Sequence, residues 1–409
     1  MYNNDTTILH VFTIIPHYFG NVKEIKRNKM KICAVICEYN PFHNGHLYQL
    51  NEAKRLSGAD ALLCIMSGCF VQRGEAAVMD KFTRAKHALL GGADAVIELP
   101  TVFATANAEL FAKGAISVLS SIPAVTTLCF GAEYADKEAF LHAATLLNNE
   151  PIEVSAKIKT LIAEGMSYAK ARTMAWDGLL PDALLTSPNN ILGVEYTRAI
   201  LECDAKIDIL PIPRVGGGYN ETALQEAFSS ATAIRTAIQT GIEFSNALPT
   251  YVKADLPQTL TDTLDSLEKY AVLSRSEWEI AQVCDCSEGL ENAFKKAALQ
   301  PQSFEESLTS ARYTSSRIRR IALQNLLKIK ENFIRECLHS SLYLRVLGVK
   351  KARTDVLSAL SEASYPMIAR AHDEDGLTDV AKAAYLTDRF AENVYALLYK
   401  PLNTHVIFL

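Results

Sequence analysis

The sequence predicts an α/β fold with a Rossmann-like, doubly wound parallel sheet, followed by a mainly α-helical C-terminal part. Short apolar runs without alternation, typical of strands covered on both faces, recur between segments with helical spacing. At 409 residues and 49% hydrophobic content, the chain can bury a large core and is long enough for two domains.

The first predicted strand covers residues 32–37 and ends before Asn40-Pro41, because proline lacks an N–H group and disfavours helix at the preceding residue. Asn44 is a good N-cap for the helix that follows. His43 and His46 therefore lie at a helix N-terminus, where free N–H groups and the helix dipole attract anions. This turn predicts a phosphate site.

Further strands, most of them separated by helical patterns, are predicted at 61–66, 95–99, 125–130 and, as the last strand, 207–210. Residues 137–175 are predicted to be a helical insertion beside the sheet. Ligands of such sheets bind beyond the carboxyl ends of the strands. Here those ends are residues 38–46, 67–75, 100 and 131–133.

Residues 230–235 predict a second anion-binding turn, at the start of a helix that runs to about Gly241. Ser230 or Thr232 can cap this helix, and Arg235 follows within its first turn. A phosphate facing this helix end would meet a hydroxyl, N–H groups and a guanidinium.

From about residue 246 the pattern is mainly helical, which places a domain boundary near residues 247–249. Basic residues of this part outnumber Glu305, Glu306, Glu331 and Glu336, a local excess suited to a phosphate backbone. They are Arg312, Arg317, Arg319, Arg320, Lys328, Lys330, Arg335, Arg345, Lys350, Lys351 and Arg353. Arg312-Tyr313-Thr314 with Arg317 and Arg320 is either an RNA contact by charge and stacking or an ordinary basic helix face.

The His-x-Gly-His pair suits adenylyl transfer, because two imidazoles can stabilise charge on the phosphates as pyrophosphate leaves. Gly45 lets the backbone approach closely. The alternative, that these are two surface histidines without a function at the start of a helix, fits the strand–loop–helix context less well.

Several other polar residues have two readings. Arg73 is a phosphate or carboxylate ligand or an exposed loop arginine, and Lys81 and Arg84 share a helix face that is usually solvated. Asn189 bonds a ribose or base or only caps its helix, and Arg214 follows a strand end, which favours a functional role.

Bulk composition excludes some classes of protein. The formal charge of −5 gives no global case for nucleic-acid binding, and no apolar run approaches the 18 or so residues of a membrane span. Nine cysteines lie mostly in apolar runs, as reduced thiols do, and Cys284 and Cys286 are too isolated for a zinc site. We predict a cytoplasmic protein without a metal site.

Residues 1–29 are expected to be a dispensable extension, or translation starts at Met30.

Six segments, read together and in order, resemble the bacterial tRNA(Met) cytidine acetate ligase family within the His-x-Gly-His nucleotidylyltransferase superfamily. They are residues 38–46, 66–75, 130–133, 188–193, 230–235 and 312–314. Cys69, Ala76 and Ala231 depart mildly from the family pattern. The resemblance spans nearly everything from residue 30 to about 400, which gives a nucleotidylyltransferase-type ATP-binding domain at 30–246 and a helical tRNA-binding domain at 247–409.

The resemblance implies that ATP activates acetate as acetyl-adenylate, without acetyl-CoA. The acetyl group then passes to N4 of the wobble cytidine in elongator tRNA(Met). His43, His46 and Arg235 would be catalytic, and Mg²⁺ is expected with ATP. The implied ATP contacts are Ile36, Cys37, Glu38, Tyr39, Asn40, Pro41, Phe42, His43, Asn44, Gly45, His46, Leu47, Tyr48, Gln49, Gly131, Asn189 and Arg214, joined by Ser230 and Thr232 of the second turn.

Two other classes remain open at this point. One is a small-molecule adenylyltransferase on the same fold, and the other is a non-catalytic RNA-binding protein. The large helical part disfavours the first class, because a small substrate does not call for it. The intact histidine pair disfavours the second. Acyl specificity and oligomeric state are not predicted.

Overall fold

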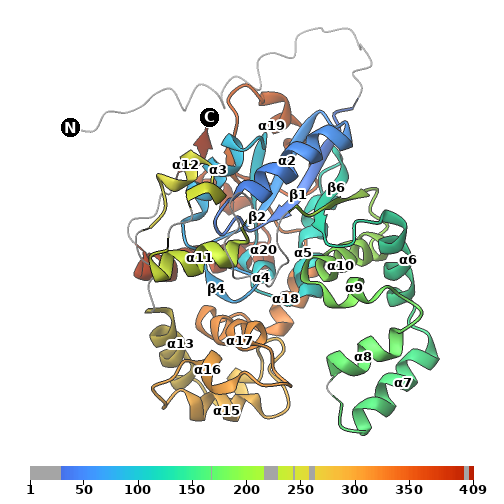
Figure 1. Cartoon of the computed structure of the whole chain (residues 1–409). Coiled ribbons are helices and arrows are strands. Elements are labelled where there is room, and N and C mark those ends of the chain that lie inside the picture. Colours follow the sequence, from blue (N-terminus) through green and yellow to red (C-terminus); the bar gives the residue numbers. More distant parts are fainter. Residues whose placement is uncertain (1–28, 167, 216–228, 243–244, 258–262, 400–404) are drawn as a thin grey trace. The chain divides into compact units, whose positions relative to one another are not determined.

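The computed structural model describes residues 29–166, 168–215, 229–242, 245–257, 263–399 and 405–409 (Figure 1). Its strands are β1 (Ile32–Cys37), β2 (Ala61–Ser67), β3 (Phe70–Val71), β4 (Glu75–Ala76), β5 (Ala95–Leu99), β6 (Val125–Ala132), β7 (Asp208–Pro213), β8 (Leu344–Val349), β9 (Met367–Ile368) and β10 (Ile407–Phe408). The predicted N-terminal extension, residues 1–29, lies almost entirely outside the described residues.

The helices of the first part are α2 (Asn44–Ser57), α3 (Lys81–Leu90), α4 (Thr101–Ala104), α5 (Ala108–Ser120), α6 (Lys137–Asn148), α7 (Ile152–Ala163), α8 (Tyr168–Trp176), α9 (Asp182–Thr186), α10 (Pro188–Glu202) and α11 (Ala231–Thr240). Those that follow are α12 (Thr250–Lys253), α13 (Thr263–Leu273), α14 (Glu277–Ile280), α15 (Leu290–Ala297), α16 (Phe304–Leu308), α17 (Ser315–Leu327), α18 (Glu331–Leu338), α19 (Thr354–Ser361) and α20 (Asp379–Leu398). Short 3₁₀ helices are η1 (Ser245–Ala247) and η2 (Ala371–Gly376).

The described strands other than β3 and β4 form one sheet in the order β10-β8-β5-β2-β1-β6-β7, with β9 beside β8, whereas β3 and β4 pair with each other as a separate antiparallel hairpin. β5, β2, β1, β6 and β7 are parallel, which confirms the predicted doubly wound sheet. The chain runs outward from β1 to β2 and β5, then returns past β1 to β6 and β7, so the topological switch point lies between β1 and β6. A ligand crevice is expected at the carboxyl ends of these two strands.

The helices cover both faces of the sheet because right-handed crossovers in opposite directions place them on opposite sides. Alternate residues of β1 and β2 pack with α2 and α3 in one buried cluster. α10 packs against β6, α5 and α6 after the direction has reversed. β7 extends further than predicted and contains two prolines, which its place at the edge of the sheet tolerates.

The part after residue 246 is mainly helical, as predicted, but it also contains the strand β8, which the sequence interpretation did not identify. β8 is buried along its whole length and pairs antiparallel with β5, so residues 247–409 complete the same sheet as residues 30–246. The parallel strands are predicted from the alternation of strand and helix patterns along the chain. An antiparallel strand such as β8 needs no crossover helix before it, so this alternation does not predict it. Arg345 also interrupts its apolar run, but the structure neutralises that charge with Glu98 at 3.2 Å and Glu392 at 2.7 Å.

The expectation that Lys81 and Arg84 are solvated is wrong, because both side chains are almost completely buried. Lys81 contacts Glu98 and Glu392, each at 2.5 Å. The Arg84 guanidinium donates hydrogen bonds to backbone carbonyls, among them those of Glu38, directly after β1, and Ser67, the last residue of β2. Arg84 thereby ties together two loops that border the predicted crevice.

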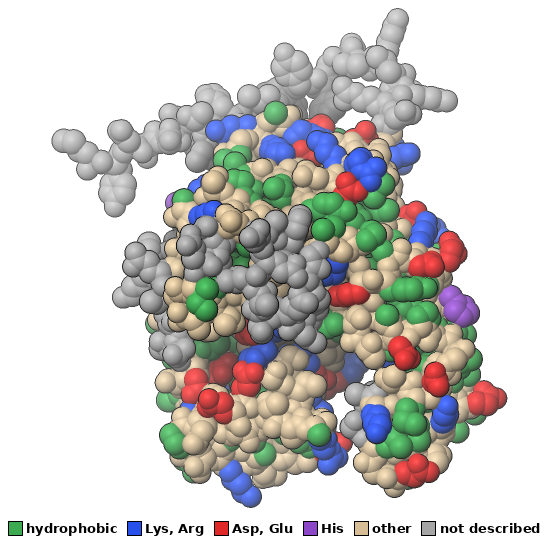
Figure 2. Space-filling model, in the orientation of Figure 1, with side chains coloured by type: hydrophobic (Ala, Val, Ile, Leu, Met, Phe, Trp, Pro, Cys, Tyr) green, Lys and Arg blue, Asp and Glu red, His purple; other side chains and the backbone are tan. Residues whose placement is uncertain are grey.

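The basic residues after residue 300 do not form one exposed basic face. Arg320 and Arg345 are buried. Three of the basic residues pair with acidic residues outside the four glutamates counted above: Arg312 with Glu288, Arg320 with Asp285, and Arg353 with Asp94 and Asp355. On the face drawn in Figure 2, Lys and Arg side chains are interspersed with Asp and Glu.

Buried cysteines agree with the prediction of structural thiols. Burial raises the pKa of Cys284 and of Cys286 to about 12, so both thiols are protonated at neutral pH. No cluster of metal-ligating side chains occurs among the residues that the structure describes. None of the described helices combines the length and apolar character needed to span a bilayer.

Candidate active site

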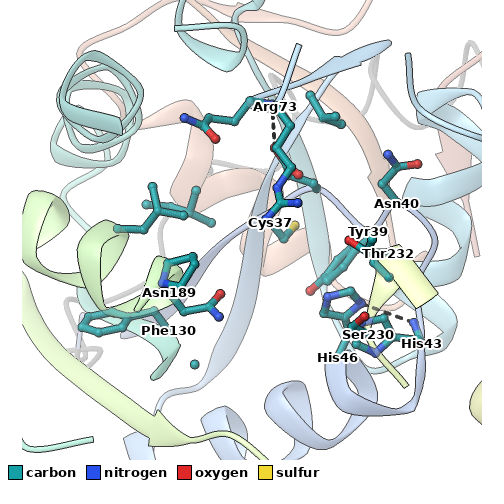
Figure 3. Close-up of a pocket in the computed structure, with 18 of the residues that line it drawn as sticks. Cys37, Tyr39, Asn40, His43, His46, Arg73, Phe130, Asn189, Ser230 and Thr232 are labelled. Carbon is teal, nitrogen blue, oxygen red and sulfur yellow. Dashed lines mark hydrogen bonds between the residues drawn. The ribbon is translucent and has the colours of Figure 1, made fainter. Parts of the chain in front are cut away.

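A cavity of about 200 Å³ lies at the switch point of the sheet (Figure 3). Its wall is built from the carboxyl ends of β1 and β6, the N-terminal turns of α2, α10 and α11, and the β3–β4 hairpin. The two predicted anion-binding turns therefore meet in one place. A smaller cavity continues past the histidines and shares Gly131, Arg214 and Ser230 with the first.

His43 and His46 together cap helix α2, whereas the sequence pattern predicts the cap at Asn44. The Gly45 N–H donates to Nδ1 of His43 at 3.1 Å, and the His43 N–H donates to Nδ1 of His46 at 3.3 Å. Their rings are stacked with centroids 3.6 Å apart. An imidazole nitrogen can accept a backbone hydrogen bond as a serine hydroxyl does, so the cap forms one residue earlier. Asn44 donates instead to the carbonyl of Asn246 at 2.8 Å.

These bonds assign the protons of both rings. Since each Nδ1 accepts a backbone N–H, each neutral imidazole carries its proton on Nε2. Burial, with a smaller contribution from the charge of Arg214, lowers the pKa of His43 to about 3. Burial, His43 and Arg214 also lower the pKa of His46 well below its ordinary value. At neutral pH the pair therefore presents two neutral Nε2–H donors at the cavity wall.

Gly45 has a structural role that the sequence pattern does not reveal, while its predicted close approach to a ligand stays a prediction. A Cβ at this position would lie 2.9 Å from Cε1 and 3.0 Å from Nδ1 of His43. Glycine therefore makes room for the folded-back His43 ring, and a larger residue would displace that ring. Tyr39 supports the pair from the other side, because its buried ring lies 4.8 Å from the His46 ring.

The second wall holds Asn189 and Arg214, joined through Glu133. Asn189 Nδ2 donates to Glu133 Oε1 at 2.5 Å, and Arg214 Nε lies 3.7 Å from the same oxygen. Asn190, next to Asn189, accepts hydrogen bonds from the Glu133 and Tyr134 N–H groups, which fixes the chain just after β6. Asn189 lines the cavity but does not cap α10, whose N-cap residue is Ser187, so the capping alternative is wrong and the contact with a ribose or base stays a prediction.

The third wall is the N-terminal turn of α11. Ser230 caps this helix by accepting the Ala233 N–H at 3.1 Å, as predicted. Arg235 donates to the carbonyl of Asn40 at 3.0 Å and lies 3.2 Å from Glu75. Arg235 thereby links the second anion-binding turn to the loop that carries His43.

The predicted residues separate into three groups. Those that line the main cavity are Ile36, Cys37, Glu38, Tyr39, Asn40, His43, His46, Gln49, Gly131, Asn189, Arg214, Ser230, Thr232 and Arg235. Gly45 and Tyr48 line only the smaller cavity. Pro41, Phe42, Asn44 and Leu47 line neither of these two cavities; Phe42 is buried and Leu47 packs against the same core.

The sequence interpretation missed an aromatic wall made by Phe111, Phe130 and Tyr196. The rings of Phe130 and Tyr196 lie 6.0 Å apart, and those of Phe111 and Tyr196 lie 6.4 Å apart. Helical spacing offered a signal for Tyr196, which follows Asn189 by two turns and so shares its face of α10. Phe111 had no such signal, because packing between α5 and α10 brings it to the site.

The fold and this site define the class of nucleotidyl transferases with a His-x-Gly-His turn, and the family model described as "HIGH Nucleotidyl Transferase" matches residues 30–406. Within that class, the chain belongs to the tRNA(Met) cytidine acetate ligase family. A member from Thermoanaerobacter sp. is 36% identical, over 91% of this chain and 96% of the relative. One from Clostridium novyi is 38% identical, over 82% and 88% respectively.

Solved structures agree with this placement. Apo TmcAL of Thermotoga maritima superposes with a TM-score of 0.85 at 31% identity, covering 93% of this chain and all of that chain. The same protein bound with alpha-thio ATP gives a TM-score of 0.82 at 32% identity, with the same coverage.

Proposed function

We propose that this protein is an ATP-dependent ligase that activates acetate and acetylates N4 of the wobble cytidine of elongator tRNA(Met). The observation that carries the proposal is the stacked His43–His46 pair, whose two neutral Nε2–H donors lie at the wall of a cavity at the sheet's switch point. The names of the relatives, and the alpha-thio ATP in the related structure, point to the same substrates.

The first step joins acetate to AMP. A carboxylate oxygen of acetate attacks the α-phosphorus of ATP, the bond to the β-phosphate oxygen breaks, and pyrophosphate leaves. Negative charge gathers on the α-phosphate oxygens, where fixed N–H donors stabilise it more than they stabilise the ground state. His43 and His46 would supply these donors without exchanging a proton, and Arg214 and Arg235 would steady the phosphates.

The second step transfers the acetyl group. The cytidine N4 attacks the acetyl carbon of acetyl-adenylate, the carbon–oxygen bond to AMP breaks, and N4 loses a proton. Residues 247–409 would hold the tRNA, although charge pairing within this part limits the candidates to exposed cations such as Lys328 and Lys351.

Mg²⁺ would accompany ATP on the oxygens of its own triphosphate. The carboxylates at the cavity already have partners: Glu38 accepts the Gln72 N–H at 2.7 Å, Glu75 contacts Arg235, and Glu133 accepts from Asn189. The described residues hold no cluster that would bind the metal alone. Magnesium would therefore neutralise phosphate charge and is not expected to bind the protein tightly without nucleotide.

The test is ATP–pyrophosphate exchange with and without acetate, followed by transfer of radiolabelled acetate to unmodified tRNA(Met). We expect exchange only with acetate, and label in tRNA(Met) but not in a tRNA without the wobble cytidine. Exchange that ignores acetate would favour a small-molecule adenylyltransferase instead. Absence of exchange with intact tRNA binding would favour a non-catalytic RNA-binding protein.

A further inference from the structure

The β3–β4 hairpin carries an ion-pair chain that connects helix α17 with the nucleotide cavity. Glu75 stands in the middle of this chain. One of its carboxylate oxygens lies 3.2 Å from Arg235 and the other lies 3.1 Å from Arg319. The side chains of Glu75, Arg235 and Arg319 are 24%, 15% and 21% exposed, so these contacts are partly shielded from water.

On the α17 side, the hairpin is held by backbone as well as by charge. Arg319 Nε donates to the carbonyl of Arg73 at 3.1 Å, and its guanidinium also binds Glu305 at 2.6 Å. Gly74 packs directly on the helix, since a Cβ there would lie 2.5 Å from backbone atoms of Arg319 and Arg320. A shift of α17 therefore has to move the hairpin turn.

On the cavity side, the same hairpin touches the loop that follows β1. The Gln72 N–H donates to Glu38, directly after β1. Arg235 donates to Asn40, three residues before His43. The same guanidinium donates to the Thr232 hydroxyl at 3.4 Å and forms the ion pair with Glu75. Glu75 and Asn40 thus fix the plane of the guanidinium at the cavity wall.

We propose that Glu75 is a positioning residue that couples α17 to the nucleotide site through Arg235. The carboxylate holds Arg235 in the orientation needed for phosphate, and Arg319 holds the carboxylate. Arg319 itself does not line the cavity. A perturbation of α17, which belongs to the part proposed to bind tRNA, would therefore change nucleotide binding without touching the nucleotide.

This inference rests on the proposed function only in naming the reaction, so nucleotide binding is measured separately. The variants are Glu75→Ala, Glu75→Gln, Arg319→Ala and the double Glu75→Ala/Arg319→Ala. Arg335→Ala on α18 is the matched control, because it removes an arginine paired with Glu331 whose side chain is 62% exposed. Calorimetry with a non-hydrolysable ATP analogue gives Kd, and acetate-dependent exchange gives kcat and KM for ATP.

We expect Glu75→Ala and Arg319→Ala each to weaken analogue binding about fivefold to tenfold and to raise KM more than they lower kcat. The double variant should bind the analogue as well as Glu75→Ala does, because both substitutions break the same ion-pair chain. Glu75→Gln retains an oxygen acceptor and should recover part of the loss. Arg335→Ala should bind like wild type.

Wild-type binding by Arg319→Ala, in a variant with an unchanged circular dichroism spectrum and Tm, would overturn the coupling. If the losses of analogue affinity in the two single variants add up in the double variant, the coupling would also be overturned, because Glu75 and Arg319 would then act independently. Failure of acetate to stimulate exchange in the wild type would sink the proposed reaction but leave the binding comparison intact.

Discussion

Replacing His43 with asparagine should change how stability depends on pH. The native state keeps His43 neutral, because burial and Arg214 lower its pKa to about 3, whereas the unfolded chain takes up a proton near pH 6.5. The stability contributed by the neutral ring is therefore fully present above pH 6.5 and is lost as the pH falls toward 3.

The size of this effect follows from the two pKa values. Between pH 7 and pH 4.5, protonation of the unfolded chain alone lowers the free energy of unfolding by about 2.5 kcal/mol. Asparagine cannot titrate but can accept the Gly45 N–H, so His43→Asn keeps the helix cap and loses only this contribution. The stability difference between wild type and variant should therefore shrink by about 2.5 kcal/mol over this pH range.

The assay is urea unfolding at several pH values, followed by the fluorescence of the buried Trp176. Acidic residues titrate equally in both proteins, so the difference isolates His43. Parallel stability curves for wild type and His43→Asn would refute the buried, neutral imidazole.

Three further predictions concern catalysis. His46→Ala should lower acetate-dependent exchange about 10²- to 10³-fold through loss of one donor, with tRNA affinity unchanged in a filter-binding assay. Gly45→Ala should lower kcat, because its Cβ displaces the His43 ring, whereas Gly376→Ala, with open space at its Cβ, should behave as wild type in the same exchange assay. Arg73, whose side chain extends into the cavity toward Cys37 in Figure 3, should bind the carboxylate of acetate. Arg73→Ala is then expected to raise KM for acetate about tenfold or more with little change in KM for ATP, and equal changes in both would contradict this role.

Much of the site was predictable because its parts are local in sequence. A buried strand, a proline-broken loop and a helix start define where His43 and His46 lie, and a Ser-x-Thr-x-x-Arg turn defines the place of Arg235. Parallel strands bring such turns to one edge of a sheet, so their convergence follows from topology.

Other features depend on contacts between distant residues and left no local signal. The burial of Lys81 requires Glu98 and Glu392, and the last of these lies more than three hundred residues further along the chain. The apparent basic surface after residue 300 is reduced by acids from elsewhere in the sequence, including Glu75 and Asp94. A count of charges in a sequence window cannot include partners outside that window.

The sequence by itself determined the class of fold, the two anion-binding turns and the family resemblance, because each rests on residues a few positions apart. Only the tertiary structure decided which nitrogen of each histidine carries the proton, how far each histidine pKa is lowered, and that both parts of the chain contribute strands to one sheet. Tautomer and pKa depend on reciprocal capping and burial, and β8 reaches the sheet by antiparallel pairing with β5. The state of the histidines and the pairing of β8 both depend on distances between atoms in the folded protein, and the spacing of residues along the chain does not specify those distances.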